Sequence, residues 1–392
     1  MPGWERTIDN DNALALLKWL RLDMSVPPRA LGKYCARCKG ITRLNQGLSL
    51  SGLRATANNC QLCRMFLRWF ERSGKGDQED VHIVSGESAL RIGPNGPSIL
   101  RICSDFPRDR QVLGCRLSLP HIFRRNPDIQ IGFPIVPVAP NPTYFKLLHA
   151  WLQQCDEDHG KECHGLSFRT LPTRVIDVGP PNSKSLRLHS SLKDEQGDYV
   201  VLSHCWGNLS LEAKQRFCTY SHNFEARSKG FNIDILPESF RDAVEITRAL
   251  GKQYLWIDSL CIKQDEDDKS DWETESRRMD TVFALAYCTI AASSATNSKE
   301  GFLKRNSSSE CIPIKSDSGK LLYVCEDVDN FEKDVEDAPL NKRAWVLQER
   351  ALSRRILHFT KNQTYWECGA GVCSATGTRM RRYVRIQKLN RF

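Results

Sequence analysis

The chain has 392 residues, of which 26% are charged and 40% are hydrophobic. This length and composition predict a globular protein of two to three domains, each able to bury a core. Lys and Arg number 56 against 47 for Asp and Glu, and six of the nine excess charges fall between Arg379 and Phe392. The body is therefore only mildly basic, and we expect no nucleic-acid partner.

No apolar run approaches the roughly 18 residues that span a bilayer, so we expect no transmembrane segment. The N-terminus has no basic start followed by an apolar stretch, which argues against a secretory signal. The 16 cysteines are therefore expected to be reduced thiols in a cytoplasmic protein.

Two Cys-x-x-Cys pairs lie in the N-terminal part, Cys35 with Cys38 and Cys60 with Cys63. Thiolates at this spacing bind Zn²⁺ tetrahedrally, so zinc is a candidate cofactor. The alternative is that Cys60 and Cys63 are small hydrophobic residues on the apolar face of a helix.

A third group, Cys155, His159 and Cys163, follows a predicted helix around Tyr144–Gln154. Steps of four residues would place the three side chains on one helix face, where they could join one of the earlier pairs as metal ligands. Capped, partly buried side chains are the alternative. Between these groups, residues 80–140 contain short apolar runs separated by Gly/Pro turns and are predicted to be β-rich.

The run Tyr199–Leu202 is continuous and apolar, as in a strand buried on both faces, and Ser203 and His204 follow at its carboxyl end. A second apolar strand, Tyr254–Ile257, ends at Asp258. Ligands of open α/β sheets bind beyond the carboxyl ends of the strands. If the two strands are parallel neighbours, Ser203 and Asp258 lie on the same rim.

Two segments with helical periodicity lie between the apolar strands in the sequence. Residues 236–251 begin with a Leu-Pro-Glu start and end at a glycine, and Asp271–Ala286 precedes a third apolar strand, Cys288–Ala292. Residues 199–292 therefore read as strand, helix, strand, helix, strand, the βαβ pattern of a parallel sheet. The second helix carries an apolar stripe through Trp272, Ser276, Met279, Phe283 and Ala286.

Glu275 breaks this stripe, because it lies roughly 60° from Trp272 around the helix. A carboxylate facing a core must find donors or keep its proton. One interpretation is a half-buried ion pair with Arg277 or Arg278. The other is a catalytic carboxylate at the mouth of the sheet.

Three motifs, LSHCWG (202–207), WIDSLCIKQ with DWETESRRM (256–279) and RAWVLQER (343–350), resemble the fungal heterokaryon-incompatibility (HET) domain in order and spacing. The resemblance covers roughly residues 199–367, and Ala344 stands where the family usually has Gly. It predicts an N-terminal region, 1–190, with the cysteine pairs and the β-rich segment, and a basic tail, 368–392.

HET domains act in fungal non-self recognition and programmed cell death and are thought to be distant relatives of TIR domains. The resemblance implies an α/β fold with a TIR-like (flavodoxin-like) parallel sheet and flanking helices, beside a smaller mixed α+β N-terminal region. Several TIR domains cleave NAD⁺ with one Glu on a helix just past a Trp. Trp272 and Glu275 occupy a similar place, with one fewer intervening residue than the common TIR pattern.

The resemblance thus implies NAD⁺ as substrate and Glu275 as the catalytic carboxylate. Ser203 and Asp258 could orient the ribose or diphosphate and Trp206 could stack on a ring, although backbone bonding, loop capping and core packing are equally available to them. We expect the motif residues Arg343, Gln348 and Glu349 to form structural pairs.

Two other functions remain open. The domain could be a non-enzymatic signalling module that triggers cell death by self-association or by recruiting another incompatibility or sensor protein. The N-terminal half could instead act as a zinc-dependent adaptor.

Overall fold

The computed structural model describes residues 4–7, 32–39, 45–73, 80–85, 89–92, 98–104, 141–159, 163, 169–304, 311–315, 321–326 and 328–382. The expected β-rich segment is described in parts up to residue 104; its remainder and residues 383–392 of the expected basic tail lie outside the described residues. No described helix is both long and apolar enough to cross a membrane.

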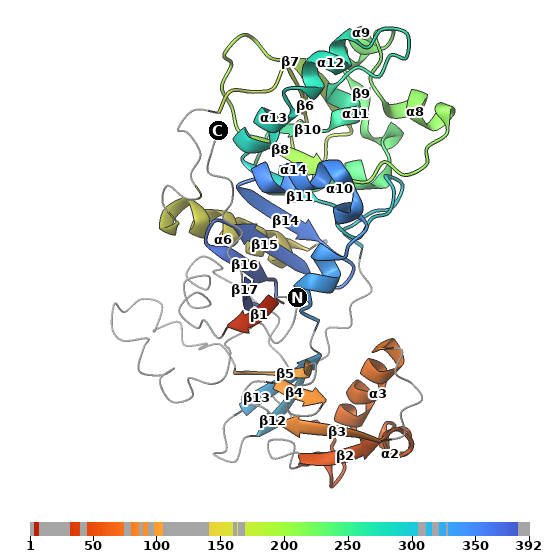
Figure 1. Ribbon diagram of the computed structural model, residues 1–392, viewed down its shortest axis with the longest axis vertical. Helices are drawn as coiled ribbons and strands as arrows, with labels where there is room; N and C mark the ends of the chain where they lie inside the picture. The colour runs from red at the N-terminus through yellow and green to blue at the C-terminus, as the bar shows by residue number, and fades with distance from the viewer. Residues whose placement is uncertain are drawn as a thin grey trace.

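A large mixed sheet dominates the described part of the chain (Figure 1). In spatial order its strands are β1 (Trp4–Thr7), β17 (Arg379–Arg382), β16 (Gly371–Ser374), β15 (Thr364–Cys368), β14 (Arg355–Phe359), β11 (Cys288–Ala291), β8 (Tyr199–Ser203), β10 (Tyr254–Trp256), β6 (Arg174–Asp177), β7 (Ser185–Ser190) and β9 (Phe231–Asn232).

The centre of this sheet is parallel: β8 pairs with β10 on one side and β11 on the other, and β11 pairs with β14. All five residues of β8 are buried, as the continuous apolar run predicts for a strand covered on both faces. The predicted strands at Tyr254–Ile257 and Cys288–Ala292 are confirmed, and so is the parallel pairing that puts Ser203 and Asp258 at the same edge. The outer strand pairs are antiparallel.

The described helices after residue 199 follow in chain order. They are α8 (Leu211–Phe217), α9 (Phe224–Lys229), the 3₁₀ helix η2 (Ile233–Ile235), α10 (Glu238–Ala249), α11 (Asp258–Cys261), α12 (Ser270–Ser276), α13 (Met279–Leu285), the π-helix η3 (Glu332–Glu336), the 3₁₀ helix η4 (Leu340–Lys342) and α14 (Ala344–Leu352). Helix α10 has the predicted start after Pro237, and Gly251 follows its end with a φ of +67°.

The helix predicted from Asp271 to Ala286 is wrong in its continuity, because the chain breaks it into α12 and α13. No apolar side chain stands between residues 273 and 278 to anchor a continuous helix on the core. Polar contacts hold α12 instead, among them an ion pair of 2.6 Å from Arg174 to Asp271. Trp272, expected on the apolar stripe, is 48% exposed.

Helix α6 (Pro142–Asp158) packs on the β15 side of the sheet. The Tyr144 and Thr364 hydroxyls lie 2.6 Å apart, and the Trp151 ring stacks on the Trp366 ring at 6.4 Å between centroids. This confirms the helix predicted around Tyr144–Gln154 and makes it part of the main core.

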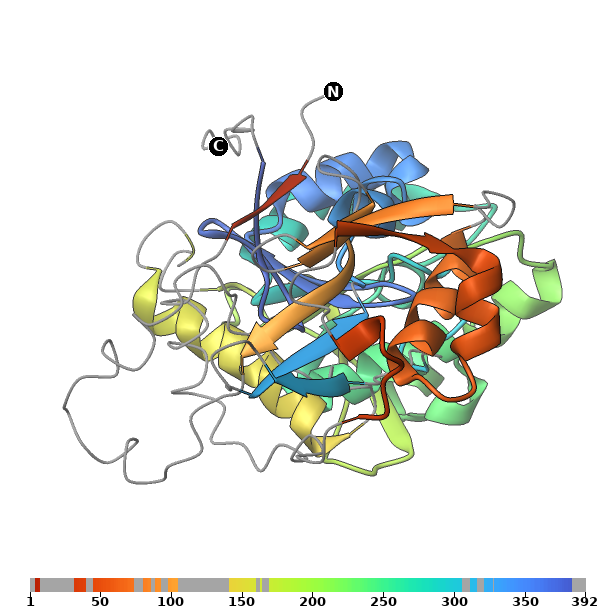
Figure 2. The ribbon, with the colours of Figure 1, turned by 90° about the horizontal axis from the view of Figure 1, so that it is seen from below.

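A second sheet lies below the first in Figure 1. It is antiparallel, with the spatial order β12 (Cys311–Lys315), β13 (Leu321–Glu326), β5 (Ser98–Ser104), β4 (Ala89–Ile92), β3 (Asp80–Ser85) and β2 (Asn45–Ser49). Helices α2 (Leu50–Thr56) and α3 (Gln61–Ser73) accompany it, and Figure 2 shows them, in red and orange, on a different side of the view from the yellow α6.

The two sheets interleave along the sequence. Strands β6 and β7 precede residue 199 but extend the large sheet beyond β10, whereas β12 and β13 follow it but belong to the second sheet, where β13 pairs with β5. Strands β16 and β17 continue the large sheet to Arg382, into the segment expected as a tail. The division at residues 190 and 367 stays a prediction.

The loop after β8 depends on a glycine, which provides a test of the fold. Gly207 has a φ of +73°, and a Cβ there would lie 2.2 Å from the Asn297 Cβ. Gly251 has a similar φ, but a Cβ there would meet nothing within 4 Å. Gly251→Ala should cost about 1 kcal/mol from backbone strain alone. Gly207→Ala should cost about 1–3 kcal/mol more, because Asn297 must also move. Urea unfolding of both variants measures the difference, and equal losses would contradict the close packing of this loop.

Candidate functional site

The carboxyl ends of the central strands bring polar side chains together. Ser203 is the last residue of β8, and Asp258 opens α11 directly after β10. The register pairs Tyr254 with Tyr199 in parallel, so both strands end at the same edge. Ser203 itself pairs with Ala291 at the end of β11. The edge is therefore where a ligand of a parallel sheet would bind.

A carboxylate reaches this edge from α14. Val346, in the second half-turn of that helix, is buried in a cluster with Cys205, Ala291 and Ile356, which fixes α14 over the ends of the strands. Glu349 follows three residues later on the same helix face. Its Oε2 accepts a hydrogen bond of 2.5 Å from the Ser203 Oγ.

The surroundings of Glu349 change its acidity. Burial raises the pKa of Glu349 from 4.5 to about 7, although the Ser203 hydroxyl bond lowers it; Asp258 raises it further, and Arg343 lowers it. The side chain is only half-buried, so solvent reaches part of it. At neutral pH this carboxyl is thus close to the midpoint of its titration, which suits a group that gives and takes a proton.

An aromatic pair lines the other side of the edge. The Trp206 Nε1 donates a hydrogen bond of 2.7 Å to Asp258 Oδ2, and the His204 ring stacks beside Trp206 at 6.4 Å with an angle of 12°. His204 Nε2 lies 3.9 Å from Asp258 Oδ1 and has no hydrogen-bond partner among the described residues. Burial lowers the pKa of His204, so its ring is neutral at pH 7.

Arg343 brings a positive charge to the same place. It is the N-cap residue of α14, and its Nη1 donates a hydrogen bond to the backbone carbonyl of His204. Its charge also works to lower the pKa of Cys205, although burial raises that pKa overall. A guanidinium that leads a helix at a strand edge is well suited to bind phosphate or carboxylate groups.

All the residues of this site fall within a region of the chain that matches a known family. Residues 199–349 match the family model described as heterokaryon incompatibility protein (HET), from the first residue of β8 to Glu349. The chain contains a HET domain. The comparison with curated proteins and the comparison with solved structures found no match. The resemblance seen in the three motifs is confirmed, and it supports a role in heterokaryon incompatibility.

Within the HET domain, the structure brings Ser203, Trp206 and Asp258 together as predicted from the rim. The structural alternatives hold only in part: Asp258 Oδ1 does accept from the backbone N–H of Ser259 at 2.7 Å, and Trp206 packs partly against the core. Ser203, however, donates to the side chain of Glu349. The role of these three residues in binding a substrate stays a prediction.

Glu275 lies elsewhere. It is 8% exposed on α12, accepts a hydrogen bond of 2.9 Å from the Thr173 Oγ1, and lies 3.5 Å from Arg278 Nη1. The ion pair with Arg278 matches the first interpretation of the sequence, although the side chain is buried and not half-buried. Among the described residues, no hydrogen bond or ion pair joins Glu275 to the residues at the end of β8. Its catalytic role stays a prediction.

Glu349, Arg343 and His204 belong to the site although sequence reasoning left them out of it. Arg343 and Glu349 were expected to form structural pairs, and Gln348 from the same motif is exposed. A signal was present: in RAWVLQER, Val346 and Glu349 are three residues apart, so a helix that buries the valine also turns the glutamate inward.

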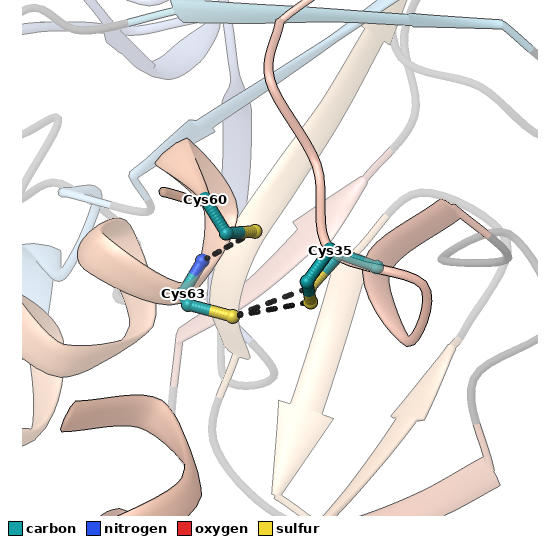
Figure 3. A group of neighbouring side chains, drawn as sticks. Cys35, Cys60 and Cys63 are labelled. Carbon is teal, nitrogen blue, oxygen red and sulfur yellow. Dashed lines mark hydrogen bonds between the residues drawn. The ribbon is translucent and has the colours of Figure 1, made fainter. Parts of the chain in front are cut away.

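The N-terminal cysteines form a second candidate site. Cys35 and Cys38 lie in a turn, Cys60 directly precedes α3 and Cys63 lies in its first turn. Figure 3 shows the side chains of Cys60 and Cys63 beside that of Cys35. The Cys63 Sγ lies 3.7 Å from that of Cys35 and 3.5 Å from that of Cys38. All four sulfurs fall within 4.8 Å of one another.

These distances suit a metal. They are far too long for a disulfide, whose sulfurs are about 2.05 Å apart. Four thiolates at about 2.3 Å from a tetrahedral Zn²⁺ would be about 3.8 Å apart. The cluster can therefore hold a metal ion such as zinc without a large rearrangement.

The titration of Glu349 predicts how stability depends on pH. Because its pKa is raised, the folded protein keeps a proton that the unfolded chain releases above pH 4.5. The Glu349 contribution to stability is thus full below pH 4.5 and is lost as the pH rises through about 7. Relative to wild type, Glu349→Gln should gain up to roughly 3 kcal/mol in unfolding free energy over that interval. Chemical unfolding at several pH values measures this gain, and a pH-independent difference would contradict it.

Proposed function

We propose that the HET domain cleaves NAD⁺ at the bond between nicotinamide and ribose, with Glu349 as the catalytic carboxylate, and that this reaction drives cell death in heterokaryon incompatibility. The observation that carries the proposal is the partly buried Glu349 carboxyl, whose pKa is raised to about 7 and which is bonded to Ser203 at the carboxyl edge of β8. No other titratable side chain of the described residues combines these features at that edge.

Strand order supports a TIR-like, flavodoxin-like fold for the domain. Numbered along the chain, the parallel strands β8, β10, β11 and β14 lie in the spatial order 2-1-3-4. In the flavodoxin-like order, ligands bind where strands 1 and 3 are neighbours. Here those strands are β8 and β11, and Ser203 stands at that position.

Spacing favours Glu349 over Glu275 as the catalytic residue. Trp345 and Glu349 are separated by one residue more than Trp272 and Glu275, which matches the TIR pattern that Glu275 misses by one. Glu349 also points to the strand edge, whereas Glu275 is bonded to Thr173 away from it.

The proposed chemistry needs one carboxylate. As the C1′–N bond breaks, its electron pair leaves with nicotinamide, which departs neutral, and the ribose develops oxocarbenium character. Ionised Glu349 stabilises this charge. Water then adds to C1′ and its proton passes to Glu349, so that NAD⁺ and water become ADP-ribose, nicotinamide and a proton.

The other side chains have positioning roles in this proposal. Ser203 and Asp258 orient the ribose hydroxyls, and the Arg343 guanidinium binds the diphosphate. Trp206 stacks on a substrate ring, and its Nε1–H bond to Asp258 holds it at the required angle.

Nicotinamide release from NAD⁺ by the purified chain tests the assignment. Glu349→Gln should lower kcat/KM at least about 100-fold, because it removes the stabilising charge and little volume. Glu275→Gln is the matched control, since it changes a buried carboxylate of the same domain, and it should stay within about twofold of wild type. The reverse result would transfer the catalytic role to Glu275.

The pH profile of the same reaction is an independent measurement. Since the carboxylate must be ionised, kcat/KM should rise with pH and level off above a midpoint near 7. Ser203→Ala should move that midpoint upward, because the hydroxyl bond that favours the ionised form is lost. A midpoint that stays at its wild-type value in Ser203→Ala would contradict the role of the Ser203–Glu349 bond.

A second candidate function has its own observation. Trp345 and Leu347, on the same helix as Glu349, are 66% and 76% exposed. Two large apolar side chains on one exposed helix favour a contact with a second copy or a partner. If the domain acts by assembly alone, toxicity on overexpression should persist in Glu349→Gln and be lost when Trp345 and Leu347 are both replaced by Ser.

We also propose that Cys35, Cys38, Cys60 and Cys63 hold a structural zinc ion, since four thiolates leave no ligand position for water. Elemental analysis of purified Cys38→Ser should show about one zinc per chain fewer than wild type, with a lower Tm. Unchanged zinc content in Cys38→Ser would contradict this site.

A further inference from the structure

A second group of side chains that could hold a metal ion lies where the end of α6 meets the end of β15. Cys155 belongs to α6, His159 caps the end of that helix, Cys163 follows, and Cys368 is the last residue of β15. Their four ligand atoms lie within 4.8 Å of one another. The sequence grouped the first three residues and suggested that they join the N-terminal pairs; the structure places Cys368 with them instead.

Local structure explains why these residues meet. Cys155 and His159 are four residues apart and so share one face at the end of α6. On β15, Cys368 and Trp366 are two residues apart and share one face of the strand. Because Trp366 stacks on Trp151 of α6, that face of the strand is directed at the helix, and Cys368 reaches its end.

The distances fit a tetrahedral ion. With Zn–S at about 2.3 Å and Zn–N at about 2.05 Å, tetrahedral geometry separates a sulfur and a nitrogen ligand by about 3.6 Å. The Cys368 Sγ lies 3.5 Å from the His159 Nδ1. The three cysteines are buried and form no disulfide, and His159 is half-buried. The four ligand atoms are therefore largely shielded from solvent, and the thiols are free to bind an ion.

We propose that Cys155, His159, Cys163 and Cys368 form a structural zinc site that joins α6 to β15. Four protein ligands fill the tetrahedral coordination sphere, so the ion has no open position for substrate or water. The ligands come from segments more than 200 residues apart in the sequence, so the ion links the region before the HET domain to strands that follow it. The site is independent of the proposed NAD⁺ cleavage.

The charge of the neighbouring groups favours such a centre. Three thiolates, one neutral imidazole and Zn²⁺ carry a net charge of −1. Arg355, which pairs with Cys368 across the β14–β15 ladder, is 2% exposed. Its Nη2 forms an ion pair of 2.6 Å with Asp156 Oδ1, but Nε, Nη1 and Nη2 make no hydrogen bond of good geometry among the described residues.

A buried guanidinium with open donors needs compensating negative charge. Arg355 and Cys163 line one small cavity, so the cluster and the arginine are neighbours. A zinc–thiolate centre with a net negative charge would compensate the positive charge of Arg355 together with Asp156.

Elemental analysis of the purified full chain is the first test. We expect about two zinc ions per chain, one at each cysteine cluster. Cys368→Ala should lose one of them and keep the other, while Cys38→Ser should lose only the N-terminal ion. A wild-type chain with a single zinc that disappears in Cys38→Ser would overturn the proposal, as would undiminished zinc in Cys368→Ala.

Conservative and matched variants separate ligation from folding. Cys368→His keeps a zinc ligand and should retain two zinc ions, whereas Cys373→Ala, a change of a half-buried cysteine on the adjacent strand β16, should leave the metal content unchanged. After exchange with Co²⁺, the visible thiolate–Co²⁺ absorption should fall by about half in Cys368→Ala and be preserved in Cys373→Ala. Equal loss of metal in Cys373→Ala and Cys368→Ala would overturn the assignment, because misfolding would then explain both.

Discussion

The hydrogen bond from Ser203 to Glu349 joins the two parts of the HET domain on which the candidate site depends. Ser203 ends β8, a strand of the parallel centre, and Glu349 comes from a helix that follows it by almost 150 residues in the sequence. The bond forms because Val346 is buried in a cluster with Cys205 after β8, Ala291 at the end of β11 and Ile356 of β14, which fixes the rotation of α14. Burial of Val346 therefore offsets the cost of partly removing the Glu349 carboxylate from water.

Burial shifts the pKa values of Glu349 and His204 in opposite directions. It raises the pKa of Glu349 and lowers that of His204, because in each case the charged form is disfavoured. Near pH 7 the His204 ring is therefore neutral and the Glu349 carboxyl is only partly ionised. A cationic ligand placed against Glu349 would favour its ionised form, and this links the proposed substrate, which carries a positive nicotinamide ring, to the electrostatics of the site.

Much of the centre of the fold could be predicted from short-range patterns. The apolar runs of β8, β10 and β11 and the terminators around α10 are local signals, and they were sufficient to place Ser203 and Asp258 on one edge. The break between α12 and α13 was missed because periodicity counts apolar positions and ignores a polar stretch that gives the helix nothing to pack against. Glu349 was missed for another reason: the spacing of Val346 and Glu349 indicates that they share a helix face, but not that this face is directed at the edge of the sheet.

Local sequence patterns do not indicate which strands pair over long distances in the sequence, and these pairings determine the architecture of the domain. The matched residues 199–349 do not form a closed unit, since β10 is flanked by β6 from before them and β11 by β14 from after them. Both neighbours cover edges that would otherwise expose unpaired backbone groups of the parallel centre. Conversely, β12 and β13 lie in the second sheet, where β13 pairs with β5. The region that matches the family model is thus smaller than the folded unit. The motifs contain the residues at the strand edge, and the segments before and after the matched region supply the strands that flank the parallel centre.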